Sequence, residues 1–320
     1  MSKISAFGTY VPDKIIDNQY FESLIETNDE WIVTRTGIKT RRFAAEDQYN
    51  SDLCIKAVED LISTSGKGVE DVDFIIVCTT SPDHTMPNTA SRIQHRMNIK
   101  NAGCYDIYAA CAGFVYGLQI AHSYVNAGVY KKVLVLGSET LSKITDFTDR
   151  TSCILFGDGA GAALIEPSDE EHFLAFNSGT NGEFGADLYL TREKSEICGV
   201  DVTTNGMIIQ NGRSVFKWAV GNIPDKIKEL CAKADMDLSD IDYIVPHSAN
   251  LRILEAISKS LDYPMERIPE SVSEFGNTSS ASIPLAIRKS MTSGGIKKGD
   301  TLLLVGFGGG LTFAGTIVKW

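Results

Sequence analysis

Short apolar runs alternate with amphipathic segments along this chain. One helix is indicated by an apolar stripe with helical spacing, formed by Leu53, Ala57, Val58, Leu61 and Ile62. A longer helical pattern extends from Cys111 to Ala127. Four continuous apolar runs have the length of buried strands, at 74–77, 133–136, 243–245 and 302–305. Buried strands that alternate with helices predict an α/β fold.

The chain also contains an internal similarity. The segment VEDVDFIIV, ending at Val77, resembles LSDIDYIVP, ending at Pro246, and VLVLG, ending at Gly137, resembles LLLVG, ending at Gly306. Both pairs of segments are separated by the same distance along the chain. Unrelated α/β segments can share apolar strands after an acidic turn, so a chance likeness is the alternative. If the duplication is real, the halves 1–168 and 169–320 meet at one shared site.

Composition narrows the class of protein. With 320 residues, of which 43% are hydrophobic and 22% charged, the chain is typical of a folded globular protein. No signal peptide is evident, and no apolar stretch approaches the roughly 18 residues of a membrane span, so we expect a soluble, cytoplasmic protein. A net charge of -11 disfavours non-specific binding to nucleic acid, so any anionic ligand must find a local basic patch. The seven cysteines form no C-x-x-C pair, which indicates neither a disulfide framework nor a metal site.

Cys111 is the first candidate for chemistry. It lies in AACAGFVYGL, a run of small residues that follows a predicted strand at 105–108 and opens the long helical pattern. A thiol at a helix N-terminus is favoured as thiolate by the helix dipole, and unpaired N–H groups there can receive an oxyanion. The alternative is an ordinary buried cysteine, which is the more common role for a residue of this type.

Two further residues fit a cysteine site. His247 ends the apolar segment IDYIVPH and begins a polar turn, so its ring should emerge at the end of a strand, a setting that the other four histidines lack. Asn277 lies in FGNTSSASIPLAI, where its amide could donate a hydrogen bond to a thioester carbonyl. Helix capping is the alternative role for Asn277, and the N-T-S glycosylation pattern is discounted for a cytoplasmic chain.

These segments resemble the signatures of the ketoacyl-ACP synthase III family. AACAGF, HSANLRI, FGNTSSASIPLAI and GFGGGLTFAG occur in the family's order, and DEWIVTRTGIKTRR and DRTSCILFGDGAGAALIEP extend the resemblance over essentially the full chain. The resemblance implies a thiolase-like fold of two pseudo-duplicated halves in α-β-α-β-α layers, usually a homodimer. It also implies decarboxylative condensation of an acyl-CoA primer with malonyl-ACP, the first step of fatty acid synthesis, with the CoA thioester as substrate rather than as a bound cofactor.

The resemblance also assigns roles to single residues. Cys111 is expected to accept the acyl group, His247 and Asn277 to hold the malonyl thioester carbonyl, and the backbone N–H groups of Cys111 and Gly309 to form an oxyanion hole. CoA is expected to contact Thr27, Trp31, Arg35, Thr36, Arg150, Gly212, Phe216 and Asn250. Trp31 and Arg150 are expected to sandwich the adenine.

Some positions concern specificity and partners. Met86 stands where acetyl-preferring members often present a Phe from the neighbouring subunit, so we expect primers somewhat longer or more branched than acetyl. Ser248 replaces a Gln that is common in the family. The positions expected to dock ACP are Lys217, Arg252 and Lys259, and the alternative is that they are ordinary solvated charges.

Other functions remain open at this stage. The order Cys, His, Asn also fits a papain-like hydrolase, although the string around the papain cysteine is absent. A second alternative keeps the fold and the acyl-cysteine but passes the acyl group to another acceptor in secondary metabolism. A third is a binding module without catalytic activity, although Cys111, His247 and Asn277 are all present.

Overall fold

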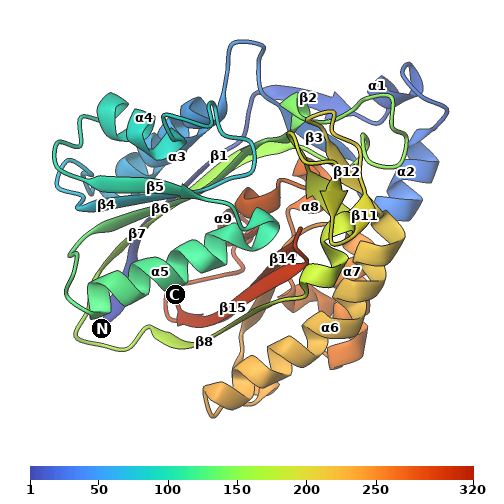
Figure 1. The fold of residues 1–320 in the computed structure, drawn as a ribbon. Helices are drawn as coiled ribbons and strands as arrows, with labels where there is room; N and C mark the ends of the chain where they lie inside the picture. Colours follow the sequence, from blue (N-terminus) through green and yellow to red (C-terminus); the bar gives the residue numbers. More distant parts are fainter.

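The computed structural model describes residues 1–320, and its first sheet is built from the N-terminal half of the chain (Figure 1). The strand order is β1(Ser2–Tyr10), β7(Asp158–Pro167), β6(Val133–Thr140), β4(Phe74–Cys78) and β5(Gly103–Ile107). β4 pairs in parallel with β5 and β6, whereas β7 runs antiparallel to β1 and β6. Every residue of β4 and β6 is buried, which explains why β4 and the first half of β6 are continuous apolar runs rather than alternating ones.

The second sheet has four strands. Their order is β13(Tyr243–Pro246), β14(Thr301–Gly308), β15(Thr312–Lys319) and β8(Phe173–Thr180). β13 and β14 are parallel, and the remaining pairs are antiparallel. The second sheet therefore repeats the order of the first, without a counterpart of β5.

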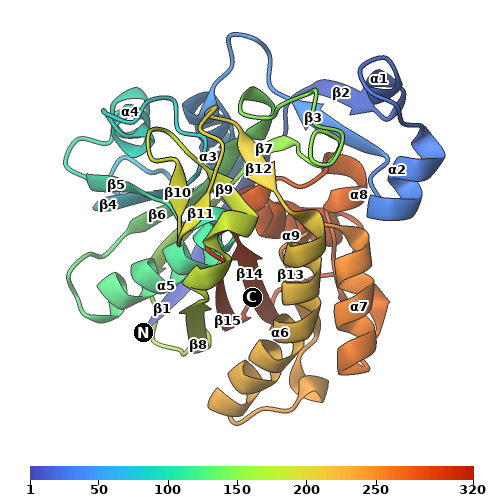
Figure 2. The ribbon, with the colours of Figure 1, turned by 45° about the vertical axis from the view of Figure 1, so that its right-hand side comes forward.

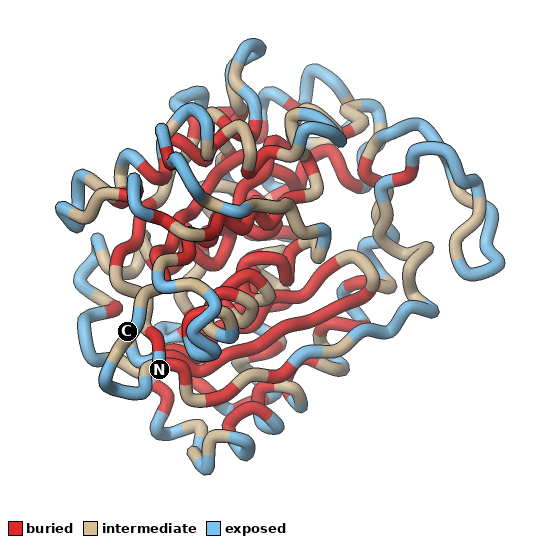
Figure 3. Tube along the Cα trace, turned by 60° about the vertical axis from the view of Figure 1, so that its left-hand side comes forward, coloured by how far each residue is buried: buried red, intermediate tan, exposed pale blue.

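Helices separate and cover the two sheets. α5(Gly113–Asn126) and α9(Ser282–Thr292) contribute to a core of 24 buried residues that also draws on both sheets, so these helices form the central layer. α3(Asn50–Ser65) and α4(Thr89–Arg96) cover the outer face of the first sheet, and α6(Gly212–Lys233) and α7(Leu251–Leu261) cover that of the second. The five layers are those expected from the resemblance, and Figure 3 shows the buried trace running through their interior.

The internal similarity corresponds to a structural repeat. In the first sheet Phe74 pairs with Val133, and in the second the equivalent positions of the similar segments, Tyr243 and Leu302, pair in the same way. The repeat extends to the acidic turns, because the Asp73 carboxylate accepts the Lys132 N–H at 3.0 Å and the Asp242 carboxylate accepts the Thr301 N–H at 2.8 Å. The likeness is thus a duplication of the fold. The dividing point at residue 168 stays a prediction.

Shorter elements gather at one end of the layers (Figure 2). They include α1(Gln19–Glu22), α2(Asp29–Thr36), α8(Val272–Phe275) and the paired strands β2(Lys14–Asp17) with β3(Thr40–Phe43), β9(Leu188–Leu190) with β12(Ile208–Gln210), and β10(Glu196–Ile197) with β11(Val200–Asp201). The 3-10 turns are Ala110–Ala112, Leu141–Lys143, Gly182–Asp187, Leu238–Asp240, Met265–Arg267 and Ser279–Ala281. None of the helices has the length and apolar character needed to cross a bilayer.

Candidate active site

Cys111 sits in the 3-10 turn Ala110–Ala112, between β5 and α5. The expected helix therefore begins at Gly113, two residues later than the sequence pattern predicted. The side chain is 8% exposed, and burial raises the pKa of the thiol to about 12, although the nearby Ser279 side chain partly opposes this shift. The resting group is a thiol near the N-terminal end of a 14-residue helix.

Two glycines of β14 let the Cys111 turn lie directly on the strand. A Cβ at Gly306 would lie 2.7 Å from Ala112 Cα, and a Cβ at Gly308 would lie 2.9 Å from Cys111 Cβ and 3.0 Å from its Sγ. Ordinary side chains at either position would push the sulfur away. The GFGGG string thus serves close approach of backbone segments rather than phosphate binding.

His247 follows β13, as the sequence predicted, and its ring is held in one orientation. Its backbone N–H donates to Val305 O at 2.8 Å, and its Nδ1 lies 2.6 Å from Ser282 Oγ. Ser282 Oγ accepts the Ser248 N–H at 3.3 Å and has no other acceptor within hydrogen-bond distance for its own proton, so we assign that proton to the bond with Nδ1. This leaves the proton of the ring on Nε2. Burial lowers the pKa of His247 to about 3, so the ring is neutral.

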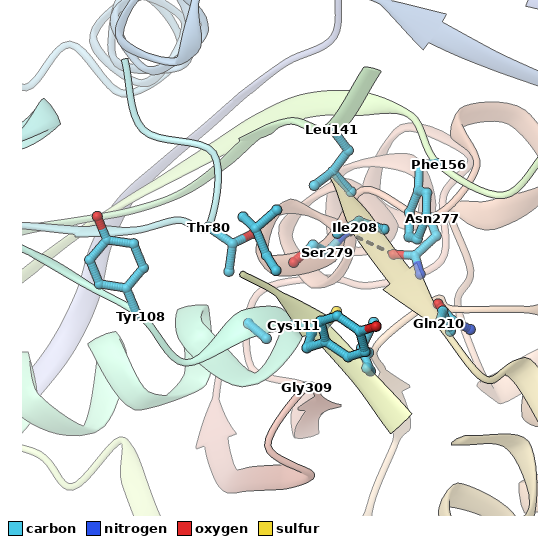
Figure 4. A pocket seen from close by; sticks show the side chains of 14 residues that line it. Thr80, Tyr108, Cys111, Leu141, Phe156, Ile208, Gln210, Asn277, Ser279 and Gly309 are labelled. Carbon is cyan, nitrogen blue, oxygen red and sulfur yellow. Dashed lines mark hydrogen bonds between the residues drawn. The ribbon is translucent and has the colours of Figure 1, made fainter. Parts of the chain in front are cut away.

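Asn277 is fixed by the neighbouring backbone. Its N–H donates to Leu155 O at 2.8 Å and its carbonyl accepts from the Gly157 N–H at 3.0 Å, which ties the residue to the segment around Phe156. The Oδ1 atom accepts the Ser279 N–H at 2.9 Å, the bond drawn in Figure 4. With the oxygen so occupied, the amide Nδ2 is the group left to donate elsewhere.

Two cavities meet at Cys111. Cys111 and Asn277 line both of them, and His247 lines the larger one. The smaller cavity, about 260 Å³, is mostly apolar and is lined by Thr80, Tyr108, Ala110, Cys111, Leu141, Phe156, Leu188, Tyr189, Leu190, Ile208, Gln210, Asn277, Ser279 and Gly309 (Figure 4). Its volume exceeds the roughly 150 Å³ that accommodates a benzene molecule.

The larger cavity, about 830 Å³, leads from Cys111 towards α2, α6 and α7. Six of the residues expected to contact CoA line it, namely Trp31, Arg35, Thr36, Gly212, Phe216 and Asn250. Two of these six already have structural partners. The Thr36 hydroxyl donates to Ile32 O at 2.6 Å, and the Asn250 side chain caps α7 and donates to Arg35 O.

The other two expected CoA contacts, Thr27 and Arg150, lie outside the residues that line this cavity. Thr27 precedes the N-cap of α2 and has a buried hydroxyl without a partner. The Arg150 guanidinium lies 4.7 Å from the centre of the Trp31 ring. An adenine stacked between these two groups needs them further apart than 4.7 Å, so Arg150 must move for the expected sandwich to form.

The comparisons with known proteins agree with this geometry. Residues 105–182 match the family model "3-Oxoacyl-[acyl-carrier-protein (ACP)] synthase III", and residues 231–320 match the model of its C-terminal part. A "Beta-ketoacyl-[acyl-carrier-protein] synthase III 2" of Bacillus anthracis is 51% identical over 100% of this chain and 98% of its own. A Bacillus subtilis protein of the same description is 46% identical, again over 100% and 98%. This chain belongs to the β-ketoacyl-ACP synthase III family.

A solved structure supports the same membership. The crystal structure of a β-ketoacyl-[acyl carrier protein] synthase III from Thermus thermophilus is similar, with a TM-score of 0.95 and 44% identity over 99% of this chain and 98% of that one. The expected fold is therefore confirmed: this β-ketoacyl-ACP synthase III, an acyltransferase of fatty acid synthesis, has the thiolase-like arrangement of its family.

Of the remaining predicted positions of this β-ketoacyl-ACP synthase III, Met86, Lys217 and Lys259 are exposed and Arg252 is half-buried. Met86 is 88% exposed and lines neither cavity of its own chain. Lys217 on α6 and Lys259 on α7 are exposed. Arg252 lines the larger cavity, pairs with Glu255 at 2.7 Å and donates to carbonyls of α2.

Sequence reasoning missed several residues of the site. Ser279 and Ser282 were part of a quoted motif, but nothing in their spacing showed that one would hold Asn277 and the other His247. The wall of the smaller cavity, contributed by Leu188, Leu190 and Ile208, comes from short strands without a clear period. The Arg213 side chain, at the mouth of the larger cavity, was missed as well.

Proposed function

We propose that this enzyme transfers the acyl group of an acyl-CoA to Cys111 and then condenses it with malonyl-ACP. The main support is the meeting of an apolar cavity and a long, partly polar cavity at a single buried sulfur, beside His247 and Asn277. The smaller cavity suits the acyl chain and the larger one suits the pantetheine arm of CoA or ACP. CoA is then a substrate and not a resident cofactor.

In acylation, the Cys111 sulfur attacks the thioester carbonyl. The negative charge that develops on the carbonyl oxygen requires fixed donors, for which we propose the backbone N–H groups of Cys111 and Gly309. Gly309 lines the same cavity as Cys111. Loss of one such donor typically raises the barrier by about 3 to 4 kcal/mol.

In condensation, the malonyl thioester loses carbon dioxide and its carbonyl oxygen becomes an enolate. We propose that His247 Nε2–H and Asn277 Nδ2–H hold this oxygen. Both groups are neutral donors, because Ser282 directs its proton to His247 Nδ1 and the Ser279 N–H occupies Asn277 Oδ1. Apolar walls disfavour the malonyl carboxylate and so favour its loss. The enolate carbon then attacks the acyl group on Cys111.

Replacing Ser282 by alanine tests the arrangement of His247. We expect condensation to slow by about 5- to 150-fold, the equivalent of the roughly 1 to 3 kcal/mol that an unpaired buried polar group costs. Acylation of Cys111 should keep its rate, because His247 is not its base. Rapid-quench measurements of the two half-reactions provide the readout. Ser282→Thr keeps the hydroxyl and should restore condensation, whereas an equal loss in both half-reactions would contradict the assignment.

Replacing Trp31 by alanine tests the CoA end of the larger cavity. Stacking of a base on an aromatic ring contributes about 1 to 3 kcal/mol, so KM for acyl-CoA should rise by about 5- to 150-fold while kcat changes little. Tyr49→Ala is the control, because Tyr49 forms a similar cation–π pair with Lys143 at 4.7 Å, away from both cavities. An unchanged KM in Trp31→Ala would show that the adenine of CoA does not bind at this position.

The papain-like alternative lacks structural support. In that mechanism the Asn orients the His, but here Ser282 binds His247 Nδ1 and the Asn277 oxygen binds the Ser279 N–H. The second alternative, transfer of the acyl group to another acceptor, uses the same first step. It differs only in the molecule that follows acyl-CoA into the site.

We propose that two copies of the chain form a homodimer. β5 is the edge strand of the first sheet, and the neighbouring Tyr108 is 60% exposed although its ring also lines the smaller cavity. Long unpaired edges are usually covered in native proteins. A partner on this edge would bring its Met86 towards the open end of the acyl cavity.

The primer range tests the role of Met86. With a flexible Met at the cavity end, we expect turnover of primers somewhat longer or more branched than acetyl, and Met86→Phe should shift preference back towards acetyl. Rates over a series of acyl-CoA thioesters measure this, with Val129→Phe as a control at another exposed apolar residue that lines neither cavity. Strict acetyl preference in the unchanged enzyme would contradict the prediction.

ACP docking is proposed for Lys217, Arg252 and Lys259 near the mouth of the larger cavity. Because this enzyme carries a net charge of -11, an acidic carrier needs such a local basic rim. The cytoplasmic location expected from the sequence stays a prediction.

Intact mass measurement tests the proposed reaction. Mixing the enzyme with candidate acyl-CoAs should add one acyl mass to Cys111, and malonyl-ACP should then remove it with formation of β-ketoacyl-ACP. If the acyl mass leaves only with another acceptor, the second alternative holds. If no acyl mass appears on Cys111 with any primer, the proposal fails.

A further inference from the structure

Glu139, near the end of β6, has a buried carboxylate that the reaction outlined above does not use. Its side chain has no exposed surface, and no Lys, Arg or His pairs with it. A buried charge without a counter-ion is costly unless many hydrogen bonds stabilise it. Glu139 contacts the turn that carries Asn277 and Ser279, so it lies next to the active site.

The carboxylate is surrounded by hydrogen-bond donors only. They are Thr79 Oγ1 at 3.1 Å, Thr80 N and Oγ1 at 3.1 Å, Ser81 N at 3.1 Å, Ser81 Oγ at 2.6 Å and Ser279 Oγ at 3.0 Å. The Ser81 hydroxyl also accepts the Thr140 N–H at 2.8 Å, so its own proton is free for Glu139. Donors on every side are the environment of an ionised carboxylate, which can accept a proton.

One donor, Ser279, connects Glu139 to the active site. Its hydroxyl donates to Glu139 Oε1 at 3.0 Å, and its side chain lines the same cavity as the Cys111 thiol, whose pKa it lowers. Figure 4 shows Ser279 in the same cavity as Cys111. The Ser279 hydroxyl is therefore placed to carry a proton from the Cys111 thiol, which lines the same cavity, to Glu139 Oε1. His247 offers no such path, because its Nδ1 is already bound by Ser282.

We propose that Glu139 stores the proton of Cys111 while the acyl-enzyme exists, with the Ser279 hydroxyl as carrier. This inference rests on the proposed function. In acylation, the Cys111 sulfur bonds to the acyl carbon, its proton passes to Ser279 Oγ, and the Ser279 proton passes to Glu139 Oε1. The bond between the acyl carbon and the CoA sulfur breaks, its electron pair stays on CoA, and the released CoA thiolate takes a proton from solvent.

In condensation, the same proton returns. Loss of carbon dioxide leaves an electron pair on the enolate carbon, which bonds to the acyl carbon on Cys111. The bond from that carbon to Cys111 breaks, and its electron pair stays on the sulfur. The sulfur recovers the proton from Glu139 through Ser279. Condensation consumes one proton overall. Glu139 supplies this proton from within the protein, so none has to enter through the cavity that the substrate fills.

The surroundings of Glu139 support this role. The titratable groups that face it are the thiols of Cys54, Cys78 and Cys111; burial raises the pKa of each of them, and the Glu139 charge raises it further. Burial also raises the pKa of the Glu139 carboxyl itself, which strengthens its hold on a proton. The ionised carboxylate thus keeps Cys111 protonated until the thioester arrives, and it becomes neutral when the sulfur is acylated.

Proton uptake in each half-reaction tests the proposal. The enzyme is mixed with one equivalent of acyl-CoA in weak buffer containing a pH indicator, and the acylated fraction is measured by intact mass. We expect about one proton taken up per acyl group formed, and about none when malonyl-ACP is then added, read before the released carbon dioxide hydrates to bicarbonate and a proton. No uptake during acylation at any pH between about 6 and 8 would overturn the proposal.

Two matched variants locate the path. Ser279→Ala should reverse the pattern, with no uptake on acylation and about one proton on condensation. Alanine fits this position, because Ala110, its equivalent in the first half of the duplicated fold, adopts a φ of 44° where Ser279 has 48°. Ser280→Ala is the control, since its hydroxyl donates to Cys78 O and does not contact Glu139. It should keep the pattern of the unchanged enzyme, and a reversal there would also contradict the path.

A spectroscopic measurement identifies the storing group. In the unchanged enzyme, acylation should produce the infrared band of a protonated carboxyl, and Glu139→Gln should lack it. If Glu139→Gln does not fold, the proton uptake of Ser279→Ala and the infrared band of the unchanged enzyme still show whether a carboxyl group stores the proton. An acyl mass on Cys111 without proton uptake would refute the store and leave the proposed function standing, whereas the absence of any acyl mass would refute both.

Discussion

Cys111→Ala is expected to remove the acyl-enzyme completely and to lower condensation by on the order of 10⁴-fold or more, because no other group replaces the nucleophile. Intact mass after mixing with acyl-CoA should show no added acyl group. The fold should be unaffected, since the thiol lines both cavities and its removal leaves no clash in the turn. Cys54→Ala, another buried cysteine but one outside both cavities, should still acylate. Full acylation of Cys111→Ala would show that another residue carries the acyl group.

Gly308→Ala is expected to slow acylation by about 100-fold, because a displacement of the reacting sulfur by about 1 Å has an effect of that size. The new methyl group would lie 2.9 Å from Cys111 Cβ and 3.0 Å from its backbone N and Sγ, so the turn must shift. The same overpacking should lower the free energy of unfolding by about 1 to 3 kcal/mol. Single-turnover acylation and thermal unfolding measure the two effects.

The control for Gly308→Ala is Gly221→Ala within α6. A Cβ at Gly221 meets no atom within 4 Å, and alanine is the better helix former. Stability should therefore rise by about 0.5 to 1 kcal/mol, with acylation unchanged. If Gly308→Ala behaved like Gly221→Ala, the close packing of β14 on the Cys111 turn would not control the position of the sulfur.

Much of the architecture could be predicted because burial leaves a direct trace in the sequence. β4 and β14 are covered on both faces, so each appears as a continuous apolar run, and the constant separation of the similar segments revealed the duplicated fold. Cys111 and His247 could be proposed because each follows a strand. The expected start of a helix at Cys111 was wrong by two residues, since apolar periodicity does not distinguish a 3-10 turn from the first turn of an α-helix.

The support of the site could not be predicted, because it depends on contacts between distant segments. Ser282 meets His247 from 35 residues away, and Ser279 meets Glu139 from 140 residues away. Serine and threonine carry no periodic signal that distinguishes a structural hydroxyl from a solvated one. Glu139, in the string GSETL, gives no indication in the sequence that it is buried.

The duplication has a consequence for how many acyl groups one chain can carry. When the two halves are aligned on their similar segments, Cys111 corresponds to Ser280, His247 to Cys78 and Gly308 to Glu139. The glycine that leaves room beside the sulfur in one half is thus a glutamate in the other, where its side chain and the hydroxyls around it occupy the corresponding volume. The counterpart of the active site, formed by Ser280, Cys78 and Glu139 from both halves, is thus filled by side chains, so each polypeptide can carry a single acyl group.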